Sequence, residues 1–178
     1  IRSEEKYFLL FNADIYFHIY SLWHNYANKP IRLEVANITG LSIAEDIYNA
    51  FKLGRAAIVA KDYNLRDEQA DILKGLLSNV IGIRAVYYLQ QSKIQLDSNK
   101  GGAFHGLSEG YGFIYSLRFV RSSNSTDALF SRDEVDGFIS TLMGDGTNGF
   151  WDITPNTLDQ ISEDIASKFD FTVAQAAE

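Results

Sequence analysis

The chain has 178 residues, no cysteine and a formal net charge of −7. The lack of cysteine excludes disulfides, zinc–thiolate sites and thiol nucleophiles. The acidic balance disfavours a nucleic-acid partner or an anionic membrane surface. Hydrophobic residues make up 46% of the chain, with 12 Phe and 10 Tyr among them. This content is sufficient for one domain with a sizeable core.

We expect neither a transmembrane segment nor a signal peptide within this sequence. No apolar run approaches the ~18 residues that a membrane-spanning helix needs. The start, Ile1-Arg-Ser-Glu-Glu5, is not a charged segment followed by an apolar core. Because the chain does not begin with Met, we interpret it as processed or as part of a longer protein.

Six segments are predicted to be helices, because their apolar positions recur every three or four residues or because a cap precedes them. In chain order they span about residues 3–27, 42–61, 64–91, 103–121, 131–143 and 154–169. The first is rich in aromatic residues and ends before Pro30. Residues 31–41 are predicted to form a loop or a short irregular strand.

Caps predict where four of these helices begin. The patterns Ser42-Ile-Ala-Glu45 and Ser131-Arg-Asp-Glu134 are capping boxes, in which the first and last side chains bond each other's backbone amides. Asn64 is predicted to cap the third helix. Thr154 followed by Pro155 places a cap and a first-position proline at the start of the sixth.

The predicted helix of residues 103–121 lies in the most informative stretch, Gly101–Phe119. Glycines at positions 102, 106 and 110 recur once per turn along one side of it. An interior glycine costs about 1 kcal/mol of helix stability relative to alanine. We therefore interpret this ladder of small residues as a surface against which a facing helix packs closely.

These patterns predict an all-α fold, an antiparallel bundle of four long helices and two short ones. We expect the glycine-rich helix to lie at its centre. Residues 1–178 are interpreted as a single helical domain.

His105, one of three histidines, precedes Glu109 by four residues, so both side chains lie on the same face of a helix. A histidine nitrogen and a carboxylate oxygen can together hold a divalent or ferric metal ion. A structural hydrogen bond within the bundle is the alternative. Asp14 and His18 form a second acid–histidine pair with the same spacing on the first predicted helix. If the two helices face each other, the four residues would make one metal site; otherwise Asp14 faces solvent and His18 is a core residue.

Two arginines compete with a metal ion for Glu109. Arg55 and Arg84 each lie within a predicted helix among small neighbours, which suggests partial burial and a need for a carboxylate partner. We expect Glu109 to be buried and paired with Arg55 or Arg84, since an unpaired carboxylate in a core costs several kcal/mol.

Residues 145–152 combine oxygen donors with glycines, but their spacing is not that of a calcium-binding EF-hand loop. We predict instead a turn anchored by Phe150 and Trp151. The motifs of serine hydrolases and of HExxH metalloproteases are absent from the sequence.

Phe104-His-Gly-Leu-Ser-Glu-Gly-Tyr-Gly-Phe-Ile-Tyr-Ser-Leu-Arg118 resembles the signature of an uncharacterised domain family of exported bacterial proteins. Further blocks of the resemblance are Phe51-Lys-Leu-Gly-Arg-Ala-Ala-Ile-Val59 with Lys61-Asp-Tyr63, Phe130-Ser-Arg-Asp-Glu-Val135, and Gly149-Phe-Trp-Asp152. The resemblance extends from about Ile43 to the C-terminus.

That family is in turn distantly similar to the imelysin-like proteins, which are helical periplasmic or lipid-anchored proteins associated with iron uptake and with a peptidase activity. Their motif is GxHxxE. In this chain Ala103 stands in place of the glycine, and the acid follows His105 at the fourth rather than the third position. The resemblance implies a location in the bacterial periplasm or at the cell surface. It also implies a longer parent, of which this chain is the C-terminal part.

Three functions remain open on this basis. The leading hypothesis is a non-catalytic binding module of the bacterial cell envelope that binds a metal ion, such as iron, through His105 and Glu109. The second is a metal-dependent peptidase of imelysin type. The third is a structural or interaction domain without a ligand. The expected partners are a metal ion or another envelope protein.

Overall fold

The computed structural model describes residues 43–121, 127–144 and 147–177. The chain divides into two compact units, residues 1–34 and residues 35–178. The predicted helix of residues 3–27, the loop of residues 31–41 and the Ser42 cap lie outside the described residues. The single-domain organisation therefore stays a prediction, and all that follows concerns the second unit.

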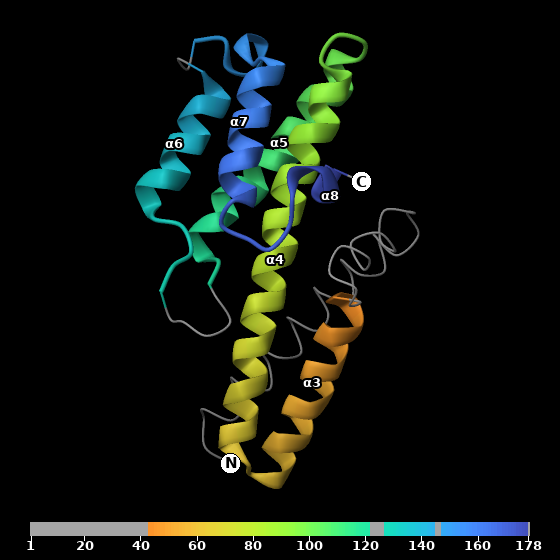
Figure 1. Ribbon diagram of the computed structural model, residues 1–178, viewed down its shortest axis with the longest axis vertical. Coiled ribbons are helices and arrows are strands. Elements are labelled where there is room, and N and C mark those ends of the chain that lie inside the picture. Colours follow the sequence, from red (N-terminus) through yellow and green to blue (C-terminus); the bar gives the residue numbers. More distant parts are fainter. Residues whose placement is uncertain (1–42, 122–126, 145–146, 178) are drawn as a thin grey trace. The chain divides into compact units, whose positions relative to one another are not determined.

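The described residues form six α-helices and two short 3₁₀ helices (Figure 1). These are α3 (Ile43–Ala60), α4 (Tyr63–Gln95), α5 (Lys100–Ser116), η1 (Leu117–Phe119), α6 (Arg132–Met143), η2 (Gly149–Asp152), α7 (Pro155–Ala166) and α8 (Val173–Ala177). These residues contain no strand, and one isolated bridge joins Arg121 to Ala128. The predicted all-α helical bundle is thus confirmed.

Two of the predicted caps are confirmed in atomic detail. At the start of α6, Ser131 Oγ accepts a hydrogen bond from the Glu134 amide at 3.1 Å, and Glu134 Oε2 accepts one from the Ser131 amide at 2.7 Å. At the start of α7, Thr154 Oγ1 accepts a hydrogen bond from the Thr157 amide at 3.2 Å, and Pro155 is the first helical residue. Local sequence thus sets both boundaries.

The predicted start of α4 was wrong by two residues. Asp62, not Asn64, is the cap, and its Oδ1 accepts a hydrogen bond from the Leu65 amide at 3.1 Å. Lys61 has a φ of 59°, which is the left-handed conformation that commonly ends a helix. The connection between α3 and α4 therefore consists of Lys61 and Asp62 alone.

The glycine-rich helix also begins earlier than predicted. Asn99 Oδ1 accepts a hydrogen bond from the Gly102 amide at 3.0 Å, so α5 starts at Lys100 rather than at Ala103. Its α-helical part ends at Ser116 and continues into η1. The sequence did contain the pattern that predicts this start, since asparagine, here Asn99, is among the preferred capping residues.

The last predicted helix ends three residues early, at Ala166 rather than Phe169, and the short helix α8 was not predicted. After α7 the Phe169 side chain lies against Gly82 of α4. A Cβ atom at Gly82 would lie 2.5 Å from the Phe169 ring, so the glycine leaves room for that ring against the α4 backbone. The chain after α7 turns to make this contact, which local sequence cannot predict.

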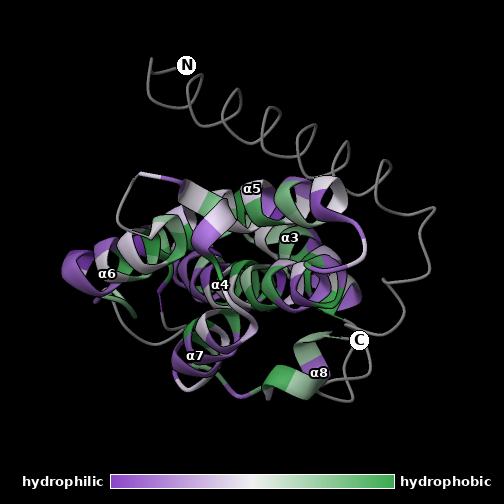
Figure 2. Cartoon of the chain, turned by 90° about the horizontal axis from the view of Figure 1, so that it is seen from above, coloured by the Kyte–Doolittle hydropathy of each residue, from purple (hydrophilic) through white to green (hydrophobic). Residues whose placement is uncertain are grey.

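The central helix of the described part is α4, not α5 as we expected. The helices α3, α5, α7 and α8 all pack against α4, with α5 and α7 on different sides of it (Figures 1 and 2). With 33 residues, α4 is about 50 Å long at 1.5 Å per residue. This length lets different helices cover its two halves.

By length and composition alone, α4 is also the one described helix that could cross a membrane. The expectation that no segment is apolar enough therefore does not hold for α4. The central helix of a bundle meets the same criteria, because it too buries apolar residues along its length.

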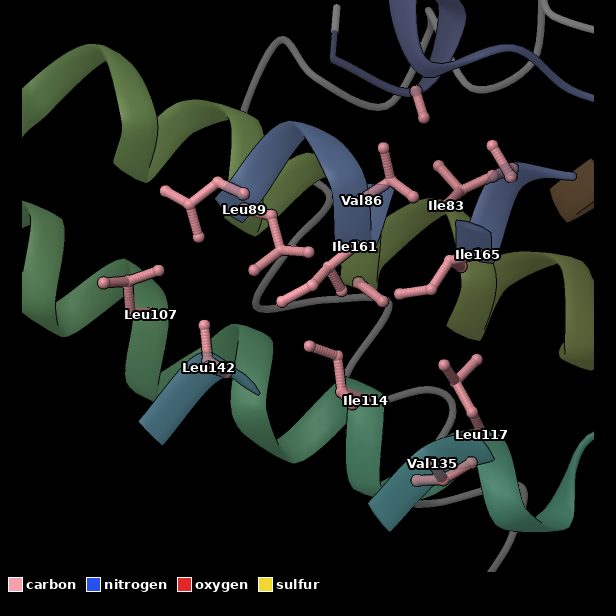
Figure 3. Close-up of a cluster of buried hydrophobic side chains, with 14 of the residues drawn as sticks. Ile83, Val86, Leu89, Leu107, Ile114, Leu117, Val135, Leu142, Ile161 and Ile165 are labelled. Atoms are coloured by element: carbon pink, nitrogen blue, oxygen red, sulfur yellow. The ribbon is translucent and has the colours of Figure 1, made fainter. Parts of the chain in front are cut away.

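The core forms where α4, α5, α6 and α7 meet (Figure 3). Its fully buried side chains include Val86, Leu89, Leu107, Ile114, Val135, Leu142 and Ile165. Burying an aliphatic side chain of this size contributes about 1.5–3 kcal/mol. These contacts fix the rotation of α5, because Leu107 and Ile114 must both face inward.

The glycine ladder lies at the contact of α5 with α4, as the sequence predicted. A methyl group at Gly106 would overlap Ser92 Oγ, and one at Gly110 would lie 3.3 Å from Tyr88 Cβ. Gly102 instead meets the side chains of Gln95 and Asn99. Two of the three glycines thus allow the close approach of the helices.

An ion pair joins the start of α6 to the end of α7. Lys168 Nζ lies 2.8 Å from Glu134 Oε1, and both side chains are more than a third exposed, at 38% and 39%. The hydrogen bond from Lys168, helped by those from Ser131, lowers the pKa of Glu134 to about 2. Solvent screening keeps the contribution of such a pair modest.

We predict different effects for alanine at two neighbouring glycines of α5. A Cβ at Gly112 would have nothing within 4 Å. Gly112→Ala should therefore raise the free energy of unfolding by about 0.4–1 kcal/mol, since alanine restricts the unfolded chain. Gly110→Ala should not stabilise, because its methyl group crowds Tyr88 in a packed interface. Chemical denaturation measures both, and equal stabilisation would contradict the packing described here.

We predict that Glu134→Gln lowers the free energy of unfolding by about 1 kcal/mol at neutral pH. The folded-state pKa of Glu134 is depressed, so its contribution is present above the ordinary value of 4.5 and is lost as the pH falls toward about 2. The variant should therefore lose less stability than the wild type over this pH range. Glu163→Gln, an exposed residue of α7, is the control. Equal acid sensitivity of wild type and Glu134→Gln would refute the assignment.

Candidate functional site

The candidate site lies on the side of α5 that faces away from the core. His105 is exposed and Glu109 is half-buried. They stand one helical turn apart, which brings their Cβ atoms to about 5–6 Å. Leu107, between them in sequence, is fully buried. The core contacts of α5 thus turn both candidate ligands toward its accessible side.

Small residues surround this pair along the same side of the helix. Gly101, Ser108 and Gly112 are all exposed. The Ser108 hydroxyl bonds back to the His105 carbonyl oxygen at 2.7 Å, so it does not project over the imidazole. The residues one turn before and three residues after His105 on this side of α5, Gly101 and Ser108, are therefore small.

Glu109 lies differently from our expectation. It is half-buried rather than buried. Within the described residues it has no ion pair, whether with Arg55 or with Arg84. Arg55 is exposed on α3, and the Arg84 guanidinium lies 5.3 Å from the centre of the Tyr87 ring. The Glu109 carboxylate remains accessible for a ligand.

The second predicted pair, Asp14 and His18, lies outside the described residues. The four-residue site therefore stays a prediction. Where the structure describes the chain, no group of three or more histidine, aspartate and glutamate residues could hold a metal ion. The described part of the site thus consists of His105 and Glu109.

Over residues 7–172 the chain matches the family model of DUF4856, a domain of unknown function. The chain belongs to the DUF4856 family. No curated protein and no solved structure matches it. The match includes all the blocks on which the resemblance to an uncharacterised domain family was based. Because the activity of the family is unknown, the residues of its site must be judged by their geometry.

One arginine of this DUF4856 domain that is both shielded and paired was not singled out from the sequence, namely Arg118. Its side chain is 21% exposed and forms an ion pair with Asp136 of α6. The guanidinium also lies 4.4 Å from the centre of the Tyr115 ring. Arg118 therefore fastens the end of α5 to α6. The sequence feature that could have predicted this ion pair is the position of Arg118, a lone arginine in the otherwise apolar end of the glycine-rich stretch.

A second polar contact of the domain also went unpredicted, and it joins α4 to α7. Gln90 Nε2 donates to Asp159 Oδ1 at 3.0 Å and to Ser162 Oγ at 2.9 Å. Lys93 Nζ lies 2.5 Å from the same Asp159 oxygen, and this hydrogen bond, with that of Gln90, lowers the pKa of Asp159. The signal was a glutamine on the apolar side of α4. Since every member has a partner, we assign these residues a structural role.

The N-terminal end of α5 carries an aromatic cluster next to His105. Phe104 meets Trp151 edge to face, with ring centres 4.9 Å apart, and Lys100 Nζ lies 5.1 Å from the centre of the Trp151 ring. Phe150 packs against the core, as predicted for an anchor, whereas Trp151 is 65% exposed. The turn predicted for residues 145–152 includes residues 145–146, which lie outside the described residues.

Proposed function

We propose that this chain is a non-catalytic binding module of the bacterial cell envelope, and that it binds a divalent or ferric metal ion through His105 and Glu109. One observation carries the proposal. Both side chains stand one turn apart on the accessible side of α5, and within the described residues neither has an ion-pair partner.

The chemistry of the pair suits metals that accept mixed ligands. Imidazole nitrogen favours Fe, Zn, Cu and Ni, and carboxylate oxygen adds affinity for the harder ions among them. Two protein ligands leave further coordination positions for water or for donor atoms of another molecule. The small residues Gly101, Ser108 and Gly112 leave room for such a molecule.

The cell-envelope location and the preference for iron rest on the resemblance of residues 104–118 to a family of exported proteins and, distantly, to imelysin-like proteins. His105 corresponds directly to the histidine of their GxHxxE motif, while Glu109 is displaced by one position. On an α-helix this displacement keeps the acid on the same face as the histidine, since both the third and the fourth residue after it are neighbours. Metal binding therefore tolerates the departure.

The imelysin-type peptidase is supported by the resemblance alone. A catalytic metal is ordinarily held by three protein ligands and keeps a position for water. The described residues supply two, and the third would have to come from elsewhere in the chain, for which Asp14 and His18 are the candidates. Peptide hydrolysis in the metal-loaded protein separates this function from binding alone.

We predict that Co²⁺, added to the ¹⁵N-labelled chain, broadens the backbone amide signals of residues 105–112 in a saturable manner. His105→Ala should abolish the effect and Glu109→Gln should weaken binding at least about tenfold, the loss expected for one charge-assisted interaction. Glu163→Gln on α7 should change nothing. Competition by Zn²⁺ and by chelated Fe³⁺ then ranks the metals.

Two results would overturn the proposal. Broadening that persists in His105→Ala would show that the metal binds at another site. If the wild-type chain shows no broadening at all, the hypothesis of a structural or interaction domain without a ligand is favoured. Peptide cleavage that requires metal and vanishes in His105→Ala would favour the peptidase. Asp14→Asn and His18→Ala report separately whether the first predicted helix contributes ligands.

A further inference from the structure

A groove of about 340 Å³ lies apart from the metal-site residues, against the middle of α4. Its walls are formed by Arg121, by Leu129 in the segment before α6, and by residues 168–170 in the turn after α7. Ligand sites in proteins commonly occupy about 300–1,000 Å³, so this groove suits a small molecule rather than a polymer. Neither His105 nor Glu109 lines it.

One side of the groove is apolar and firmly held. Leu76 and Leu129 pack against the core cluster, as does Phe169. The Phe169 ring is stacked on Phe171, with centres 5.1 Å apart, and rests where Gly82 leaves the α4 backbone bare. Because these neighbours hold the ring on more than one side, the apolar surface is preformed.

The charged residues that line the groove differ in whether they have partners. Lys168 is occupied, since its ammonium group lies 2.8 Å from Glu134. The side chains of Arg121 and Asp170 have neither a hydrogen bond nor an ion pair with each other or with any other described residue. Arg121 is nevertheless held at its backbone, where its amide donates to Ser78 Oγ at 2.9 Å. As far as the described residues go, the groove therefore presents a positive group, Arg121, and a negative group, Asp170, that have no side-chain partner.

We propose that this groove binds a small apolar zwitterion of the amino-acid class. Its carboxylate would pair with the Arg121 guanidinium and its ammonium group with the Asp170 carboxylate. The apolar side chain would lie against Leu76, Leu129 and Phe169.

Both charges of the ligand are needed for this match. A phosphate or another dianion would satisfy Arg121, but Asp170 in the same small groove would repel it. An apolar molecule without charge would cover both ionic groups without compensating them, which costs free energy. A zwitterion satisfies each group with its opposite charge, and an apolar side chain adds the hydrophobic contribution of the preformed wall.

The test is a titration of the ¹⁵N-labelled 178-residue chain with L-leucine and L-phenylalanine, followed by amide chemical shifts. We expect saturable shifts centred on Gly75, Leu129 and Asp170. Arg121→Gln and Asp170→Asn should each weaken binding at least about tenfold, as for the loss of one charge-assisted interaction. The matched controls Arg132→Gln and Asp97→Asn, both exposed, should leave the affinity unchanged.

Ligand analogues test the same idea on the unaltered chain, so the result does not depend on how the variants fold. 3-Phenylpropionate lacks the ammonium group and 2-phenylethylamine lacks the carboxylate, and each should bind at least about tenfold more weakly than phenylalanine. The proposal is overturned if neither amino acid gives saturable shifts, or if either analogue binds as tightly as phenylalanine. Shifts that disappear in His105→Ala would overturn it too, by placing the ligand on α5.

Discussion

The close contact between α4 and α5 is the constraint on which the rest of the described structure depends. Gly106 and Gly110 bring α5 against the α4 backbone, and Leu107 and Ile114 then fill the core on the same side. A helix that is held this closely cannot rotate, because any turn would bring a larger side chain into the space of a glycine. The direction in which every other residue of α5 points is thereby fixed, including that of His105.

Several charged residues form ion pairs that join the helices of the bundle. The charged residues that do not take part in these pairs are the ones considered for ligand binding. Arg118 pairs with Asp136, Lys168 with Glu134 and Lys93 with Asp159, so that α6 and α7 are each tied to the core by at least one ion pair. Each pair is partly exposed, and none contributes much alone. Glu109 has no ion pair within the described residues. The site on α5 and the groove beside α4 are distinguished from this framework by their uncommitted charges.

Membership of the DUF4856 family brings no activity with it, since the family is defined as a domain of unknown function. Functional reasoning must therefore start from chemistry. The two proposed sites differ in their chemistry. An imidazole and a carboxylate on one helix face are typical of metal ligands, whereas opposite charges beside an apolar wall are typical of a site for an organic ligand. One domain can carry both, because they involve different residues.

The sequence by itself determined the helical class, the starts of α6 and α7 and the placement of His105 and Glu109 on one face of a helix. These features depend on interactions within a few residues, such as the capping box of Ser131 and the spacing of four along a helix. Only the tertiary structure decided that α4 is central, that Arg118 rather than Arg55 is shielded and paired, and that Glu109 is half-buried. Each of these depends on how far one helix is rotated against another. That rotation is set by the packing of side chains distant in sequence, and a repeat of 3.6 residues does not specify it.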